Sequence, residues 1–160
     1  MNKSEYNVIR AVYDRFCTRR FALPTKQRLC EVEAVIGATF PADFRKFILE
    51  FNGGVFENAL AIPRSPISAK WRDGVAVHHD LSIEILCGID ASFQLGGVSD
   101  YAMFENNMPL KLLPIGYAAE GTLVLGFGAD LHGRIFIKMT YDIPIEVCAS
   151  ISELFALIRC

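Results

Sequence analysis

Hydrophobic residues recur at helical spacing in the first third of the chain and form short, closely spaced runs in the rest. Segment 40–54 shows the helical pattern most clearly, because its apolar residues fall at positions i, i+3, i+4 and i+7 of one face. Those residues are Phe44, Phe47, Ile48 and Phe51. Pro41 suits a helix start, and Asn52-Gly53-Gly54 suits a helix end that needs left-handed backbone. The segment is therefore predicted to be a helix with a buried aromatic face.

Two further helices are predicted before this segment. Ser4 can cap a first helix that extends to Arg19 and Arg20, where positive charge suits a helix end. Thr25 can cap a second helix that stops at Gly37. The inward residues are Ile9, Val12, Tyr13 and Phe16 in the first helix and Leu29, Val32 and Ile36 in the second. Three helices are thus expected before any strand.

After Gly54 the chain changes to short apolar runs separated by Pro, Gly and Asp, which is the pattern of strands and turns. The predicted strands cover residues 56–62, 75–79, 81–86, 110–115, 122–127 and 134–139, with a short helix at 99–107. Strand 122–127 is apolar on both faces, so it is placed in the interior of the sheet.

Ser150 and Glu153 form a capping-box pattern at the start of a closing helix. Its inward residues are Ile151, Leu154, Phe155 and Ile158. Helices followed by strands and a last helix predict an α+β fold. We expect a single domain over residues 1–160, with N-terminal helices and a C-terminal helix packed on a largely antiparallel mixed sheet.

Several of these packing and turn residues form a pattern in three blocks, at 36–54, 113–136 and 150–158. The motif residues are Phe40, Pro41, Phe44, Phe47, Asn52, Gly53, Gly54, Pro114, Ile115, Gly116, Gly121 and Gly133. The pattern resembles the SUKH superfamily, which contains bacterial immunity proteins and fungal cell-wall synthesis regulators of the Smi/Knr type. The resemblance spans about residues 25–160 and implies a SUKH-like domain, in which these residues have structural roles.

Composition agrees with a globular domain, since 52% of the 160 residues are hydrophobic and 21% are charged. Residues 1–7 lack the apolar core of a signal peptide, and no apolar run has the length of a membrane span, so a cytoplasmic protein without a membrane partner is expected. Five cysteines lie far apart without a C-x-x-C pair, which favours free thiols.

Charge is unevenly distributed, although the net charge is only −2. The first fifty residues carry nine Lys or Arg and six Asp or Glu, whereas the rest carry seven and twelve. Between Asp73 and Asp130 there are eight acids and one base, Lys111. This excess disfavours a nucleic-acid partner on this part of the surface and permits a basic protein partner, although acids that keep sheet edges and loops soluble are the simpler explanation.

The residues proposed for partner binding, from charge and side-chain type, are Trp71, Asp73, Glu84, Asp100 and Glu120. Trp71 is the single tryptophan and lies among charged residues, a setting typical of binding residues, although a side chain folded back over the sheet is the favoured alternative.

Catalytic and metal sites find little support in the sequence. His78 and His79 are adjacent in a predicted strand and would point to opposite faces, so one metal could not easily bind both. The glycines Gly126 and Gly128 precede a turn and a strand, whereas a phosphate-binding loop requires a following helix. No catalytic residue, metal or cofactor is therefore predicted.

The resemblance implies a non-enzymatic protein-binding module. The favoured function is a bacterial immunity protein that neutralises a secreted toxin of nuclease or deaminase type encoded nearby, acting as a monomer or weak homodimer. A regulatory scaffold related to the fungal proteins and an enzyme of unrecognised type are the alternatives. An upstream reading frame that encodes a secreted toxin would favour the first.

Overall fold

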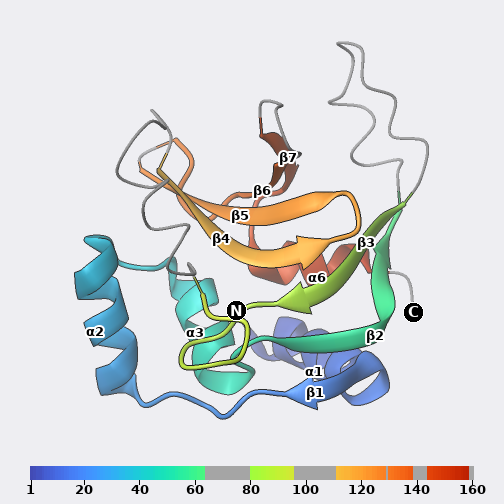
Figure 1. Ribbon diagram of the computed structural model, residues 1–160, viewed down its shortest axis with the longest axis horizontal. Helices are drawn as coiled ribbons and strands as arrows, with labels where there is room; N and C mark the ends of the chain where they lie inside the picture. The colour runs from blue at the N-terminus through green and yellow to red at the C-terminus, as the bar shows by residue number, and fades with distance from the viewer. Residues whose placement is uncertain (64–79, 96–110, 129, 139–143, 159–160) are drawn as a thin grey trace.

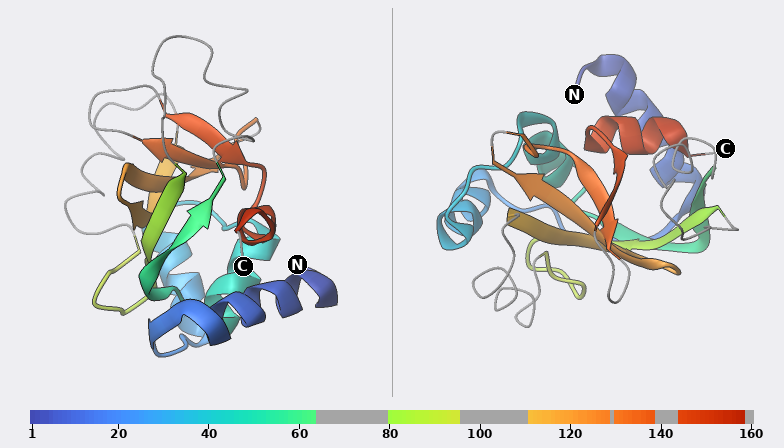
Figure 2. Two further views of the ribbon diagram at one scale, coloured as in Figure 1. Left: turned by 90° about the vertical axis from the view of Figure 1, so that its right-hand side faces the viewer. Right: turned by 90° about the horizontal axis from the view of Figure 1, so that it is seen from above.

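The computed structural model describes residues 1–63, 80–95, 111–128, 130–138 and 144–158. Within these ranges the chain forms four helices and seven strands. Helices cover one face of a single twisted sheet (Figures 1 and 2). The predicted α+β class, with N-terminal helices and a C-terminal helix packed on the sheet, is confirmed.

The helices are α1 (Lys3–Phe16), α2 (Lys26–Ile36), α3 (Ala42–Glu50) and α6 (Ile151–Leu157). Thr25 caps α2 through its hydroxyl, which accepts a hydrogen bond from the Arg28 N–H, and Gly37 ends α2 in left-handed conformation. Ser150 caps α6 as predicted, but the Glu153 carboxylate accepts from the Ala149 N–H instead of the Ser150 N–H. The cap of α1 is Asn2, so the predicted Ser4 cap is wrong.

The strands are β1 (Cys17–Arg20), β2 (Gly54–Ile62), β3 (Leu81–Leu86), β4 (Lys111–Ala118), β5 (Gly121–Phe127), β6 (Ile135–Lys138) and β7 (Ile145–Cys148). They lie side by side in chain order, and each neighbouring pair is antiparallel. An isolated bridge between Gly88 and Gln94 is parallel. Strand β5 lies in the interior of the sheet, as its apolar character predicts.

Two strands are absent from the sequence-based prediction. Residues 17–20 pair with β2 as strand β1, so α1 stops at Phe16 and does not continue to Arg19 and Arg20. Strand β7 pairs with β6. Both are four-residue edge strands, and such short segments lack a readable alternation of polar and apolar residues. The predicted strand at 75–79 and the helix at 99–107 lie outside the described residues.

The core lies between the sheet and helices α1, α3 and α6 (Figure 2). Phe47 is at its centre, 1% exposed, with ring contacts to Tyr13, Phe44, Phe51 and Phe155. The helical spacing of the α3 phenylalanines thus produces the predicted buried aromatic face.

Glu33 is a buried acid that the sequence pattern did not single out, because it lies between the apolar positions of α2. Its carboxylate accepts a hydrogen bond of 2.7 Å from the Phe40 N–H and lies 3.6 Å from the Arg45 guanidinium. These contacts satisfy the buried charge and fix the connection between α2 and α3.

Candidate functional site

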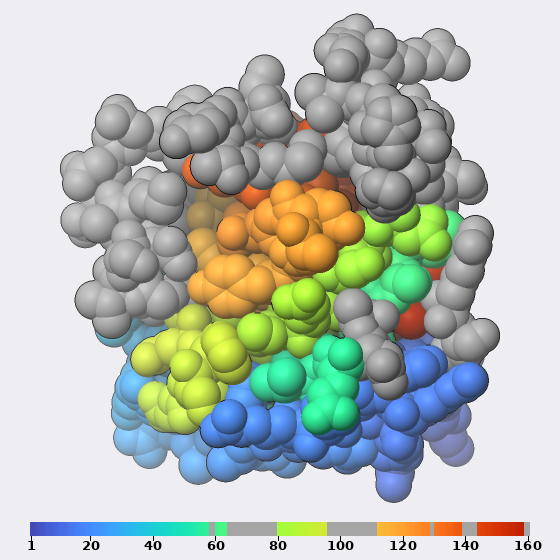
Figure 3. Space-filling model, turned by 45° about the vertical axis from the view of Figure 1, so that its right-hand side comes forward, coloured from blue at the N-terminus to red at the C-terminus, as the bar shows by residue number. Residues whose placement is uncertain are grey.

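The second face of the sheet is not covered by any helix in the described part of the chain (Figure 2). Its β4–β6 end holds a small cluster of Leu112, Val124 and Phe136, against which Leu131 packs. Figure 3 shows the other part of this face, where the surfaces of β2, β3 and β4 lie side by side. That part is the candidate functional surface.

A row of residues in register crosses this face from strand to strand. We call the row the cross-strand row, and it consists of Arg19, Val55, Ile85, Tyr117, Thr122 and Lys138. Arg19 is exposed, and the other five side chains are partly exposed. Directly opposed residues on neighbouring antiparallel strands lie on the same face, so the six side chains form one continuous strip.

Core packing on the opposite face fixes the direction of the row. Leu86, Leu123 and Ile137 are at most 1% exposed and belong to the main core, and each is next in sequence to a row residue. Since successive strand residues point to opposite faces, their neighbours Ile85, Thr122 and Lys138 point away from the helices. Tyr117 is also partly packed against the main core.

The 88–95 loop, which follows β3, lies on the uncovered side of the sheet in both views of Figure 2. Its backbone is turned by a Gly88 N–H to Phe93 carbonyl bond and a Leu95 N–H to Gly88 carbonyl bond. Asp90, Ser92 and Gln94 are exposed, whereas Ile89 and Leu95 are buried. The loop thus exposes polar side chains beside the sheet while its two ends are fixed in the core.

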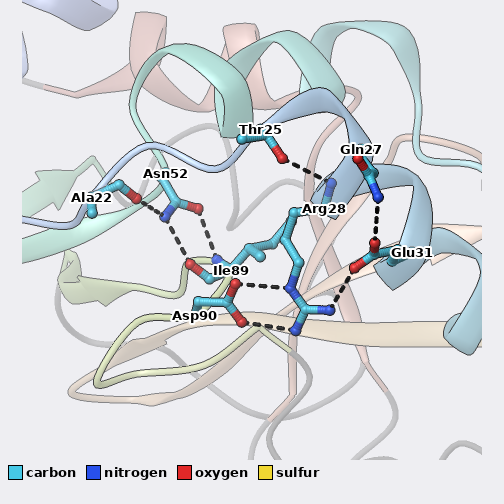
Figure 4. Close-up of polar contacts among 8 residues, drawn as sticks. All are labelled: Ala22, Thr25, Gln27, Arg28, Glu31, Asn52, Ile89 and Asp90. Carbon is cyan, nitrogen blue, oxygen red and sulfur yellow. Dashed lines mark hydrogen bonds and ion pairs between the residues drawn. The ribbon is translucent and has the colours of Figure 1, made fainter.

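Asn52 holds the start of this loop from the end of α3 (Figure 4). Its side chain is completely buried, donates to the carbonyls of Ala22 and Ile89, and accepts a hydrogen bond of 2.8 Å from the Ile89 N–H. A Cβ added to Gly88 would lie 2.2 Å from the Asn52 carbonyl oxygen, so the two segments need this close approach. Asn52 therefore holds the start of the loop against the end of α3.

Arg28 holds the loop from α2. Its Nε and Nη2 atoms donate to the two carboxylate oxygens of Asp90, each at 2.8 Å (Figure 4). Its Nη1 atom donates to Glu31 at 3.1 Å. The bidentate hydrogen bonds from Arg28 lower the pKa of the Asp90 carboxyl below its usual value and raise the pKa of Arg28. Asp90 adopts a positive φ of 53°, which is uncommon for a residue with a side chain.

Arg19 connects the loop to the cross-strand row. Its Nη2 atom donates to the Ser92 hydroxyl at 2.7 Å, and its backbone pairs with Val55 of β2. The row and the loop are therefore joined by a direct contact.

Two of the residues proposed for partner binding, Glu84 and Glu120, lie in the described part of the chain. Glu84 is exposed on interior strand β3. Glu120 is only partly exposed, and its carboxylate accepts a hydrogen bond of 3.0 Å from the Ser82 N–H, which fixes the β4–β5 turn against β3. Trp71, Asp73 and Asp100 lie outside the described residues. Sequence reasoning missed Arg28 and Asp90, which are 62 positions apart.

No metal-binding group of three His, Cys, Asp or Glu side chains is present among the described residues. His78 and His79 lie outside them. The described cysteines Cys17, Cys30, Cys87 and Cys148 are not in disulfide bonds. Burial raises the pKa of the Cys17 thiol, so the unreactive protonated form dominates there at neutral pH. None of the described helices combines the length and the apolar character needed to cross a bilayer.

The sequence matches the model of one known protein family. The family model described as SMI1 / KNR4 family (SUKH-1) matches residues 23–157. No curated protein and no solved structure matches the chain in the corresponding comparisons. The matched range runs from the segment before α2 to the end of α6, and it includes the Asn52 contacts, the 88–95 loop and all strands except β1. The chain therefore belongs to the SMI1 / KNR4 family (SUKH-1).

Proposed function

We propose that this protein is a non-enzymatic binding protein of the immunity type. It neutralises a secreted protein toxin by binding the toxin through the face of the sheet that no described helix covers. Family membership supports a binding or regulatory role in general. The observation that carries the specific proposal is the cross-strand row, because it combines partly exposed apolar, aromatic and cationic side chains on one strip.

The chemistry of the row suits a protein interface. Tyr and Arg are enriched at the energetic centres of interfaces, and Ile85, Val55 and Tyr117 provide apolar area without a covering helix from the described part of the chain. Rigid strands position these side chains, so little conformational entropy is lost on binding.

The acidic excess of this part of the sequence favours a basic partner. The chain from Asp73 to Asp130 contains eight acids and one base. Glu84 is exposed on β3 and Asp90 on the 88–95 loop, close to the row in the structure. Acidic residues near an apolar strip speed the encounter with a basic protein and disfavour nucleic acid.

Placing a further cation in the row, at the position paired with Tyr117, should weaken binding. We expect Thr122→Arg to reduce affinity for the toxin domain encoded by the neighbouring reading frame by about 10- to 100-fold, because the added bulk and charge would face a basic partner. Titration calorimetry with the purified domain, together with rescue of cells expressing it, measures the effect.

Val8→Arg is the matched control, since Val8 is an exposed residue of α1 on the helical side. It should leave affinity and rescue unchanged. Equal losses for both variants would place the interface elsewhere. A neighbouring frame without a toxin, or toxin binding without rescue, would contradict the immunity function and favour a regulatory scaffold.

Ionic strength should slow association with the toxin domain. The Debye length falls from ~10 Å at 0.1 M to ~3 Å at 1 M salt, so long-range attraction between acidic and basic surfaces is screened. We expect the association rate constant to fall steeply over this range, the dissociation rate to change less, and Glu84→Lys to slow association. Stopped-flow measurements test this. If the association rate constant changed with neither salt nor Glu84→Lys, the acids would be solvated surface residues without a role in binding.

A further inference from the structure

The 88–95 loop is held unusually firmly for an exposed segment. Side chains from three different elements fix it: Asn52 after α3, Arg28 of α2 and Arg19 of β1. Connecting loops are commonly mobile unless such contacts restrain them. Each of these contacts acts on a different position of the loop, namely Ile89, Asp90 and Ser92.

The Arg28–Asp90 and Arg19–Ser92 contacts are exposed and do little for the core. The Arg28 and Asp90 side chains are 41% and 55% exposed, and exposed ion pairs contribute at most about 1 kcal/mol to folding. The hydrogen bonds from Arg28 instead hold Asp90 at its positive φ, a conformation that persists only when neighbouring groups impose it. Fixing the shape of the loop is therefore their main effect.

We propose that the 88–95 loop is a preformed wall of the partner interface and that Arg28 is its positioning residue. This inference rests on the proposed function and adds a second contact element to it. The loop continues the cross-strand row through the Arg19–Ser92 hydrogen bond, so one partner can contact both. Its partner is the same basic protein, whose cations face the exposed carboxylate of Asp90.

The 88–95 loop is preorganised for binding, because its conformation is fixed before the partner arrives. A loop that is already fixed loses little conformational entropy when the partner binds, whereas a released loop must be ordered at that moment. Arginine is required for this role, because its planar guanidinium donates to both oxygens of Asp90 and lysine cannot reproduce that geometry.

Arg28→Ala and Arg28→Lys test the proposal in the full-length protein, with the neighbour-encoded toxin domain as the probe. We expect Arg28→Ala to weaken binding by about 5- to 20-fold, Arg28→Lys to recover only part of this, and the denaturation midpoint to stay nearly unchanged. Hydrogen exchange at the backbone amides of Gly88 and Leu95, which donate hydrogen bonds within the loop, should become faster in Arg28→Ala without partner.

Arg10→Ala is the matched control, because it removes another exposed arginine–aspartate pair, with Asp14, on α1. It should leave binding and loop exchange unchanged. If wild-type protein binds and Thr122→Arg weakens binding while Arg28→Ala has no effect, the loop inference is wrong and the proposed function stands. If wild-type protein does not bind the toxin domain, both are wrong. Weaker binding explained fully by a lower denaturation midpoint would also overturn the inference.

Discussion

Replacing Phe47 with alanine is expected to lower the free energy of unfolding by about 3–5 kcal/mol. The ring is 1% exposed and lies 5.7 Å from Phe155 of α6, 6.3 Å from Tyr13 of α1 and 5.9 Å from Phe51, between ring centroids. Because these neighbours belong to different elements, the structure could not close the cavity without moving a helix. The cost therefore includes the lost transfer energy and the cavity.

Urea or guanidinium unfolding of both proteins measures the difference, with Val35→Ala as a control for loss of side-chain volume on a helix. Val35 lies on α2 and is 74% exposed, so its truncation should change stability by less than about 0.5 kcal/mol. A cost below about 1 kcal/mol for Phe47→Ala would be incompatible with the core described above.

The helices could be predicted because their periodicity reflects one-sided burial. In α3 the predicted inward residues Phe44, Phe47 and Ile48 are each at most 1% exposed. Interior strand β5 was also recognisable, since a strand with buried residues on both faces reads as a continuous apolar run. In α3 and in β5, the positions of the apolar residues in the sequence correspond directly to the positions that are buried.

Edge strands and helix ends were harder to predict, because their structure depends on distant partners. Residues 17–20 read as a helix end with two arginines, yet pairing with β2 makes them a strand. Asn2 replaces Ser4 as the cap of α1, and both residue types are good caps, so local chemistry alone could not choose between them.

The candidate surface could be predicted only in part. Acidic character was visible in the sequence, but the cross-strand row depends on register and on bulges such as the one between Ile83 and Ile85. That bulge places Ile83 in the core and Ile85 on the uncovered face, although residues two apart in a regular strand would point to the same face. The Arg28–Asp90 contact joins two elements that are remote in sequence, so no local pattern indicates it.

Asn52 gives the second large effect. Its side chain satisfies two carbonyls and one N–H in a fully buried position, so Asn52→Ala should cost about 3 kcal/mol or more. Alanine would also have to keep a positive φ of 52°. Denaturant unfolding measures the loss, and hydrogen exchange at Ile89 should increase strongly. A cost below about 1 kcal/mol would mean that water replaces these bonds.

Asn52→Asp separates hydrogen bonding from shape. The carboxylate could still accept from the Ile89 N–H, but it would face the carbonyls of Ala22 and Ile89 without a proton to donate. Burial and these oxygens should raise the pKa of the new carboxyl in the folded state. The folded protein then binds more protons than the unfolded chain, so stability relative to wild type should rise as pH falls.

Comparing unfolding free energies at about pH 7.5 and about pH 4.5 tests this sign, since the interval includes the range where a carboxyl with a raised pKa gains its proton. Asn2→Asp is the matched control, because Asn2 is the exposed cap of α1 and accepts from the Glu5 N–H. A charged aspartate suits a helix N-terminus, so this variant should lose stability relative to wild type as pH falls. If both variants changed in the same direction, the buried carbonyls of Ala22 and Ile89 would not control the charge at position 52.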